Sequence, residues 1–239
     1  MDRCTIPENL QSLHAQEEEL RTRGRDIVEG DERLSLHLVV VERAMDLADL
    51  LRQYPSEDED LKVVQVLGMR TFNAFGASVK LGLSGYGQNA ALVIRDILET
   101  VFLLDLFRGD PAAIERWRNA DRRERMQQFS PRRVREALDE RDGFTSGRRA
   151  ELYRLFSELA GHPTMNSVHM MRPQVDGEAV IGPFIEAGSL EAVLSEMGRL
   201  AVQVGEVLNH FFPETWVDAV AARAAFARVH RAWLDTFYR

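Results

Sequence analysis

Apolar side chains recur every three or four residues along most of this chain, and strand-like alternation is rare. A period near 3.6 residues places such side chains on one face of an α-helix, where they can be buried against other helices. The pattern therefore predicts an all-α protein, a single helical bundle of about seven to nine helices.

Breaks in this pattern divide the chain into expected helices and one irregular region. Helices are expected over 31–53, 60–83, 88–107, 111–119, 130–140, 146–161, 189–212 and 215–238, with Asp31 and Ser189 as N-caps. Residues 165–188 hold three glycines and two prolines, and 175–178 indicate a turn, which predicts an irregular loop or small hairpin. We expect 1–30 to be an exposed N-terminal helix or arm, and 31–239 to be one helical domain with 165–188 as a loop insertion.

The length of the chain, its single cysteine and its N-terminal residues exclude several classes of protein. A chain of 239 residues can bury a full core, and Cys4 alone cannot form an internal disulfide, so a disulfide-rich secreted scaffold is excluded. The first residues lack the apolar run of a signal peptide, and no stretch reaches the ~18 apolar residues of a membrane span. We therefore expect a cytoplasmic protein with no membrane partner.

Charge is unevenly distributed along the chain, whose formal net charge is −8. Residues 108–149 carry 12 arginines and 8 acidic residues, so this segment is basic while the remainder is acidic. The overall acidity argues against a protein that coats nucleic acid. The basic segment is either a solvated, salt-bridged helical face or a surface that follows an RNA backbone. The arginines that could face RNA are Arg116, Arg118, Arg122, Arg123, Arg132, Arg133 and, further along the chain, Arg154.

Arg95 and Glu99 stand out in the segment 88–107, which is the most apolar of the expected helices. On a helical wheel the two charged residues fall outside the narrow polar stripe of this helix, among apolar side chains. The pair is therefore expected to face inward, where removing two charges from water costs several kcal/mol. The ion pair either links loop carbonyls and helix ends by hydrogen bonds or forms part of a ligand pocket.

A second polar group is expected at the end of the helix 146–161. Tyr153 and Ser157 lie one turn apart beside its apolar face, and His162 and Thr164 follow directly. These residues could form a polar patch that binds a ligand, or Tyr153 could pack in the core while His162 caps the helix by its charge. If the two helices are neighbours, the polar groups converge. The expected ligand-binding cluster is Arg95, Glu99, Tyr153, Ser157, His162 and Thr164.

Other candidates for chemistry have weaker patterns. Glu206 and His210 lie one helical turn apart and could supply two ligands to a metal enzyme, but no spaced histidine or cysteine pair accompanies them. His37 lies among leucines and is expected to be a hydrogen-bonded histidine near the core. The chain has no phosphate-binding glycine loop and no serine-hydrolase motif. No cofactor and no metal are therefore expected, and an enzymatic activity is left open.

Three features together resemble the helical HEPN group, the higher eukaryote and prokaryote nucleotide-binding domains. They are the helix with Arg95 and Glu99, the Tyr153-x-x-x-Ser157 pair and the His162-Pro163 step, spread over roughly 60–164. The resemblance implies an all-helical bacterial domain. For the ribonucleases of that group it also implies an arginine that stabilises phosphate charge while a histidine moves a proton.

The spacing of arginine and histidine departs from that group, whose ribonucleases hold the two four to six residues apart late in a helix. Arg154 and His162 have seven residues between them, whereas Arg223 and His230 have six but lie outside the region of resemblance. The sequence therefore favours a non-catalytic module that binds a protein or small-molecule partner at a buried polar cluster. The alternative is a HEPN-like, metal-independent ribonuclease or toxin-like effector. The charged first helix and the alanine-rich last helix are both candidate surfaces for a homodimer.

Overall fold

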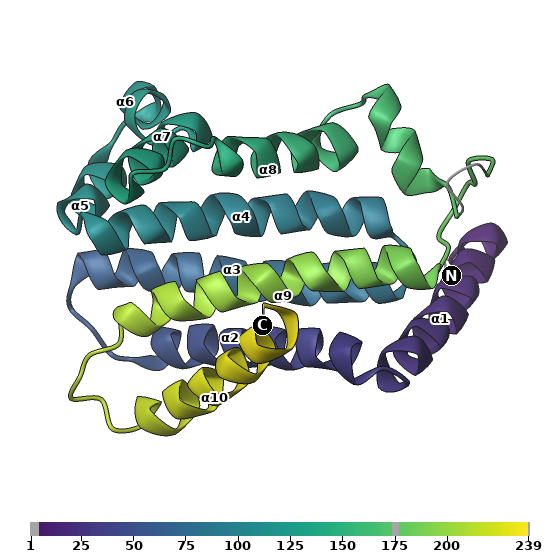
Figure 1. The fold of residues 1–239 in the computed structure, drawn as a ribbon, viewed down its shortest axis with the longest axis horizontal. Helices are drawn as coiled ribbons and strands as arrows, with labels where there is room; N and C mark the ends of the chain where they lie inside the picture. The colour runs from purple at the N-terminus through teal and green to yellow at the C-terminus, as the bar shows by residue number, and fades with distance from the viewer. Residues whose placement is uncertain (1–4, 174–176, 239) are drawn as a thin grey trace.

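The computed structural model describes residues 5–173 and 177–238, and within these ranges it holds ten α-helices and no strand (Figure 1). The all-α prediction is confirmed, and the number of helices lies just above the expected range. In chain order the α-helices are α1 (Glu8–Glu29), α2 (Glu32–Gln53), α3 (Glu59–Leu83), α4 (Gly87–Gly109), α5 (Ala112–Asn119), α6 (Arg122–Gln128), α7 (Pro131–Asp142), α8 (Arg148–Phe156), α9 (Ala187–His210) and α10 (Ala219–Phe237). A π-helical turn, η1 (Ser157–Gly161), continues α8, and a 3₁₀ helix, η2 (Met165–Met171), follows it.

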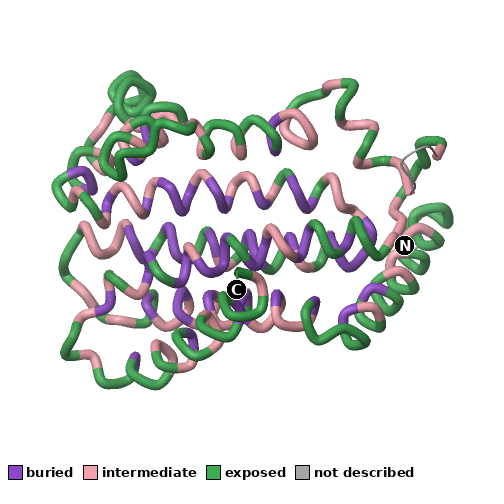
Figure 2. Tube along the Cα trace, viewed as in Figure 1, coloured by how far each residue is buried: buried purple, intermediate pink, exposed green. Residues whose placement is uncertain are grey.

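Four long helices, α2, α3, α4 and α9, form the centre of the molecule. They pack in a closed ring, with α2 against α3, α3 against α4, α4 against α9 and α9 against α2. Figure 2 shows that buried residues concentrate along these helices, whereas the outer helices are largely exposed. Fully buried side chains include Leu47, Phe75, Leu98, Phe107 and Met197, so each of the four helices contributes to one core.

The remaining helices cover this bundle from outside. α10 packs on α2, α8 and η1 pack on α4, and α5, α6 and α7 gather at one end of α4 (Figure 1). α1 contacts α2 and α3 and buries Gly24 and Val28, while most of its other residues stay exposed. α4 therefore contacts the other central helices on one side and α8 with η1 on another. Residues of α4 line both of the cavities described below.

Local sequence signals account for where several helices begin. Asp31 and Asp58 each accept hydrogen bonds from two backbone N–H groups at the start of α2 and α3, as expected of N-caps. α9 begins earlier than expected, because Glu186 and not Ser189 is its N-cap. The Glu186 side chain accepts a hydrogen bond from the backbone N–H of Ser189.

Two of the expected helices differ in detail from the structure. The helix expected over 146–161 keeps α-helical geometry only to Phe156, after which its last turn widens into η1. In α10 the alanines make little contact with the bundle, since Ala219 is the only one of them that is buried. The large side chains of Phe226 and Trp233 carry the contact of α10 with the bundle instead.

The region 165–188 is irregular, as expected. Its described residues form η2 and no strand, so the alternative of a small hairpin is not realised there, and the turn expected at 175–178 lies partly outside the described residues. Where this region returns to the bundle, the Phe184 N–H donates a hydrogen bond to the Gly85 carbonyl over 3.2 Å. Gly85 has a φ of 84°, and a Cβ there would overlap the Phe184 backbone, so only glycine permits this crossing. None of the described helices has the length and apolar character of a membrane span.

Candidate functional site

Arg95 and Glu99 form the ion pair that the helical wheel predicts. They lie one turn apart on α4, with 3.1 Å between Arg95 Nη2 and Glu99 Oε1. Their side chains are 19% and 32% exposed, so the pair is half-buried rather than fully enclosed. Both groups therefore lie where partial desolvation strengthens their interaction and where a ligand can still reach them.

Tyr153 on α8 joins this pair, so the two predicted polar groups do converge. An Nη2–H of Arg95 donates a hydrogen bond to the Tyr153 hydroxyl oxygen, and the guanidinium carbon lies 4.8 Å from the centre of the tyrosine ring. The η1 turn places Gly161 directly against the Arg95 guanidinium, where a Cβ would overlap it. The position of Arg95 thus depends on the hydroxyl of Tyr153 in α8, which accepts its hydrogen bond, and on Gly161 in η1, which has no side chain to displace it.

Arg135 on α7 completes the cluster, and the sequence analysis did not single it out. Its guanidinium carbon lies 4.0 Å from the ring centre of Tyr153, which has Arg95 as its other cationic neighbour. Burial lowers the pKa of Arg135, and the nearby Tyr153 and Glu99 partly oppose this effect. Two guanidinium groups therefore lie against one tyrosine ring, and of these two only Arg95 forms an ion pair among the described residues, with Glu99, which leaves an excess of positive charge in a half-buried place.

Several guanidinium nitrogens in this cluster are buried without a hydrogen-bond acceptor. They are Nε of Arg95 and both Nε and Nη1 of Arg135, none of which has a partner among the described residues. Buried N–H groups are nearly always paired with protein or water, because an unpaired donor costs about 1–3 kcal/mol. The cluster can therefore accept further hydrogen-bonding oxygens.

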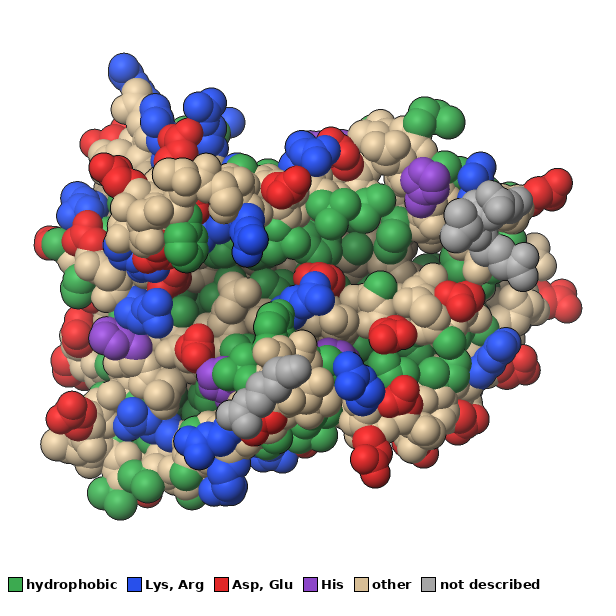
Figure 3. Space-filling view, in the orientation of Figure 1, with side chains coloured by type: hydrophobic (Ala, Val, Ile, Leu, Met, Phe, Trp, Pro, Cys, Tyr) green, Lys and Arg blue, Asp and Glu red, His purple; other side chains and the backbone are tan. Residues whose placement is uncertain are grey.

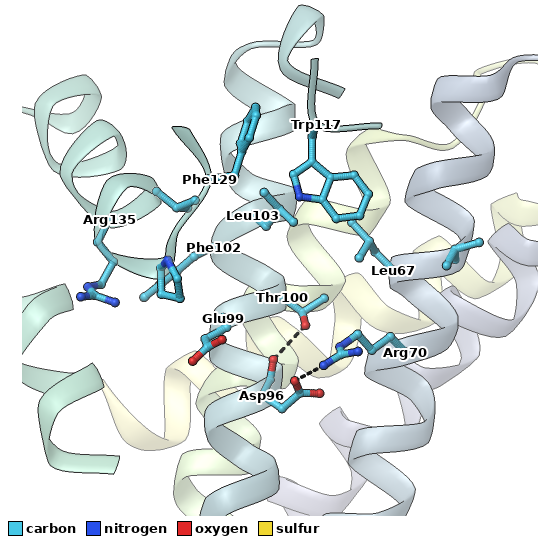
Figure 4. Close-up of a pocket in the computed structure, with 13 residues that line it drawn as sticks. Leu67, Arg70, Asp96, Glu99, Thr100, Phe102, Leu103, Trp117, Phe129 and Arg135 are labelled. Carbon is cyan, nitrogen blue, oxygen red and sulfur yellow. Dashed lines mark hydrogen bonds and ion pairs between the residues drawn. The ribbon is translucent and has the colours of Figure 1, made fainter. Parts of the chain in front are cut away.

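A pocket of about 400 Å³ adjoins the cluster, between α3, α4, α5 and α7 (Figure 4). One part of its wall is apolar and aromatic, with Leu67, Leu103, Trp117 and Phe129. The other part is charged and contains the ion pair of Arg70 with Asp96, together with Glu99 and Arg135. Figure 4 shows Trp117 and Leu67 on one side of this pocket and Arg135 on the other. The pocket thus offers flat apolar surface and guanidinium donors to one small molecule.

The other predicted cluster residues have structural roles or lie apart. The Ser157 hydroxyl donates to the Tyr153 carbonyl over 2.8 Å, and the Thr164 hydroxyl donates to the Glu158 carbonyl over 2.6 Å. These bonds fix the backbone of α8 and η1 and leave neither hydroxyl directed at the pocket. The His162 side chain is exposed, and no described side chain bonds to it.

Most of the arginines proposed to face RNA are paired with carboxylates of the protein itself. Arg116 pairs with Asp110, Arg118 with Asp60, Arg132 and Arg133 with Glu136, and Arg154 with Glu158. Arg122 and Arg123, in α6, are exposed and make no ion pair with any described residue. The pairing favours the interpretation of this segment as a salt-bridged helical face.

The remaining candidate residues lie elsewhere in the molecule. His37 is 2% exposed and its Nδ1 accepts a hydrogen bond of 2.9 Å from Trp233 Nε1, which confirms it as a hydrogen-bonded core histidine. A carboxylate oxygen of Glu206 lies 3.6 Å from His230 Nε2, and Arg223 donates to the Asn209 side chain. Among the described residues, no three histidine, cysteine or acidic side chains gather as metal ligands would.

No known protein family, curated protein or solved structure matches this chain, so its function has to be inferred from the geometry described above.

Proposed function

We propose that this protein is a non-catalytic binding module and that its pocket beside Arg135 takes a small aromatic carboxylate. The observation that carries the proposal is that Arg135, which lines this pocket, has two buried guanidinium nitrogens without an acceptor among the described residues. A carboxylate offers two oxygens to a guanidinium fork, and such charge-assisted bonds are about twice as strong as neutral ones.

The charge of the cluster favours a single negative charge over a phosphate. The two positive charges of Arg95 and Arg135 exceed the single negative charge of Glu99 by one, so one ligand carboxylate makes the group neutral. A phosphate would bring a second negative charge close to Glu99, and like charges in a half-buried place repel strongly.

The apolar wall of the pocket favours a ring on the same ligand. Trp117 and Phe129 present aromatic surface, and planar groups pack well against such surface in offset or edge-to-face arrangements. A volume of about 400 Å³ lies within the range of small-molecule sites.

The cluster holds carboxylates and a tyrosine, but among the described residues no histidine, cysteine or free serine hydroxyl is directed into the pocket. Ser157 is bonded to backbone, His162 is exposed and apart, and no histidine or cysteine is among the described residues that line the pocket. A binding role follows more directly from these residues than a reaction does.

The test is isothermal titration with indole-3-carboxylate as the probe and with indole as the uncharged control. We expect saturable binding of the carboxylate, and a tenfold or greater loss of affinity in Arg135→Gln, since one charge-assisted pair contributes about 1.5–3 kcal/mol. Arg132→Gln is the matched control, because Arg132 lies one turn away on α7, is exposed and pairs with Glu136. Equal binding of carboxylate and indole, or equal losses in the two variants, would refute the proposal.

A further inference from the structure

A second cavity lies on another side of α4, between α8 with η1 and the helix α9. It encloses about 430 Å³ and is mainly apolar, with Ala91, Ile94, Leu159, Met170 and Val193 among its walls. Figure 3 shows hydrophobic side chains gathered on the surface between α8 and α9. Contiguous apolar surface of this kind on a folded protein often marks a ligand groove or an interaction site.

The cavity is elongated along α9. The residues of α9 that line it include Ser189, Val193, Glu196 and Arg199, which recur every three or four residues and so share one face of the helix. Ten residues of helix span about 15 Å, so the groove is much longer than a single ring. Its Ser189 end lies next to the crossing of Phe184 over Gly85, because residues 184–186 lead directly into α9. Arg199 marks the opposite end along α9.

The charged residues that line this groove are Glu186 at its Ser189 end, and Glu196 and Arg199 toward the opposite end. Arg199 is the one arginine or lysine among the described residues that line it, and its side chain is 47% exposed. Arg199 pairs with Glu196, which lies one turn earlier and is more enclosed. Burial raises the pKa of Glu196, and the ion pair with Arg199 opposes this effect. Because about half of the Arg199 side chain is exposed, a ligand carboxylate can reach its guanidinium beside Glu196.

We propose that this groove binds a single-chain alkyl carboxylate, with the chain along Ile94 and Val193 and the carboxylate at Arg199. The site is separate from the pocket beside Arg135 and does not depend on the function proposed for it. An extended methylene chain matches a long groove whose walls are mainly apolar, and a carboxylate matches the guanidinium at its end.

The test is isothermal titration of the full chain with hexanoate, octanoate and decanoate below their micelle concentrations. Each buried methylene contributes about 0.8 kcal/mol, so affinity is expected to rise about fourfold per CH₂. Octanol and octylammonium, which have the same chain, test the head group. We expect octanoate to bind at least tenfold more tightly than either one.

Three variants locate the ligand in the groove. Ala192 lines the groove but is exposed, so Ala192→Trp fills the space without disturbing the core and is expected to abolish binding. Glu191→Trp, at the exposed neighbouring position outside the groove, is the matched control and is expected to bind normally. Glu196→Gln removes the competing carboxylate and is expected to tighten octanoate binding. Affinity that is independent of chain length, preference for octylammonium, or full binding by Ala192→Trp would overturn the proposal.

Discussion

Acidification is expected to destabilise this protein through a single buried histidine, His37. The ring is 2% exposed, and its Nδ1 accepts a hydrogen bond from the indole N–H of Trp233, so it is held in the neutral form. Burial, with Arg199 and Arg33 nearby, lowers the pKa of His37 from 6.5 to about 4, and Asp31 opposes this shift only weakly. Protonation would place a charge in the core and remove the acceptor of Trp233.

The sign and size of the effect follow from proton linkage. Because the folded pKa lies below the unfolded one, the unfolded chain binds more protons between pH 6.5 and 4, and stability is lost as pH falls through this window. At ~1.4 kcal/mol per pH unit, the interval corresponds to about 3 kcal/mol, most of which is lost by pH 4.

Urea unfolding at pH 7, 6, 5 and 4 measures this loss, with His37→Asn as the reference because an amide oxygen can still accept from Trp233. We expect the wild-type free energy of unfolding to fall more steeply with pH than that of the variant, by about 3 kcal/mol over the window. His14→Asn, on the exposed face of α1, controls for histidine loss as such. Parallel curves for wild type and His37→Asn would refute the reasoning.

Two further outcomes test the polar cluster and the alternative function. Arg95→Ala is expected to lower the free energy of unfolding by about 2 kcal/mol, because it strands the half-buried Glu99 and removes the hydrogen bond to Tyr153. Arg70→Ala, which breaks the more exposed pair with Asp96, should cost less than about 1 kcal/mol, and equal losses in thermal melts would show that burial is not the cause. Since Arg154 is paired with Glu158, we expect RNA incubated with the protein in EDTA to stay intact on a gel. Cleavage that disappears in His162→Ala or His230→Ala would instead support the ribonuclease.

Much of the fold is readable from the sequence because the hydrophobic period and the capping residues act locally. Asp31 caps the helix it was expected to cap, and Asp58 caps α3 by the same kind of local hydrogen bond. The helix α6 has an equally local signal, the capping box of Asp121 and Glu124, but it lies among arginines with no apolar period to indicate a helix. Periodicity finds helices that bury a face, and α6 has no buried residue.

In the candidate site, too, the contacts within one helix can be predicted from the sequence, and the contacts between helices cannot. Arg95 and Glu99 share one helix, so their pairing follows from helical geometry alone. The contact of Tyr153 with Arg95 required two helices to be neighbours, which sequence could suggest but not establish. Arg135 is one residue from the buried Val134, and only the packing of α7 beside α4 and α8 brings it over the tyrosine ring. Its role is a property of tertiary structure, for which a single sequence offers no periodic signal.

The contact between Arg95 and Gly161 constrains how this chain can change over evolution. The missing side chain at position 161 is the space that the guanidinium at position 95 occupies. A side chain at 161 would push the guanidinium aside, and the flexible end of Arg95 can move only by giving up its present place against the Tyr153 hydroxyl. A substitution at 161 should therefore weaken a hydrogen bond made by a residue 66 positions away in the sequence.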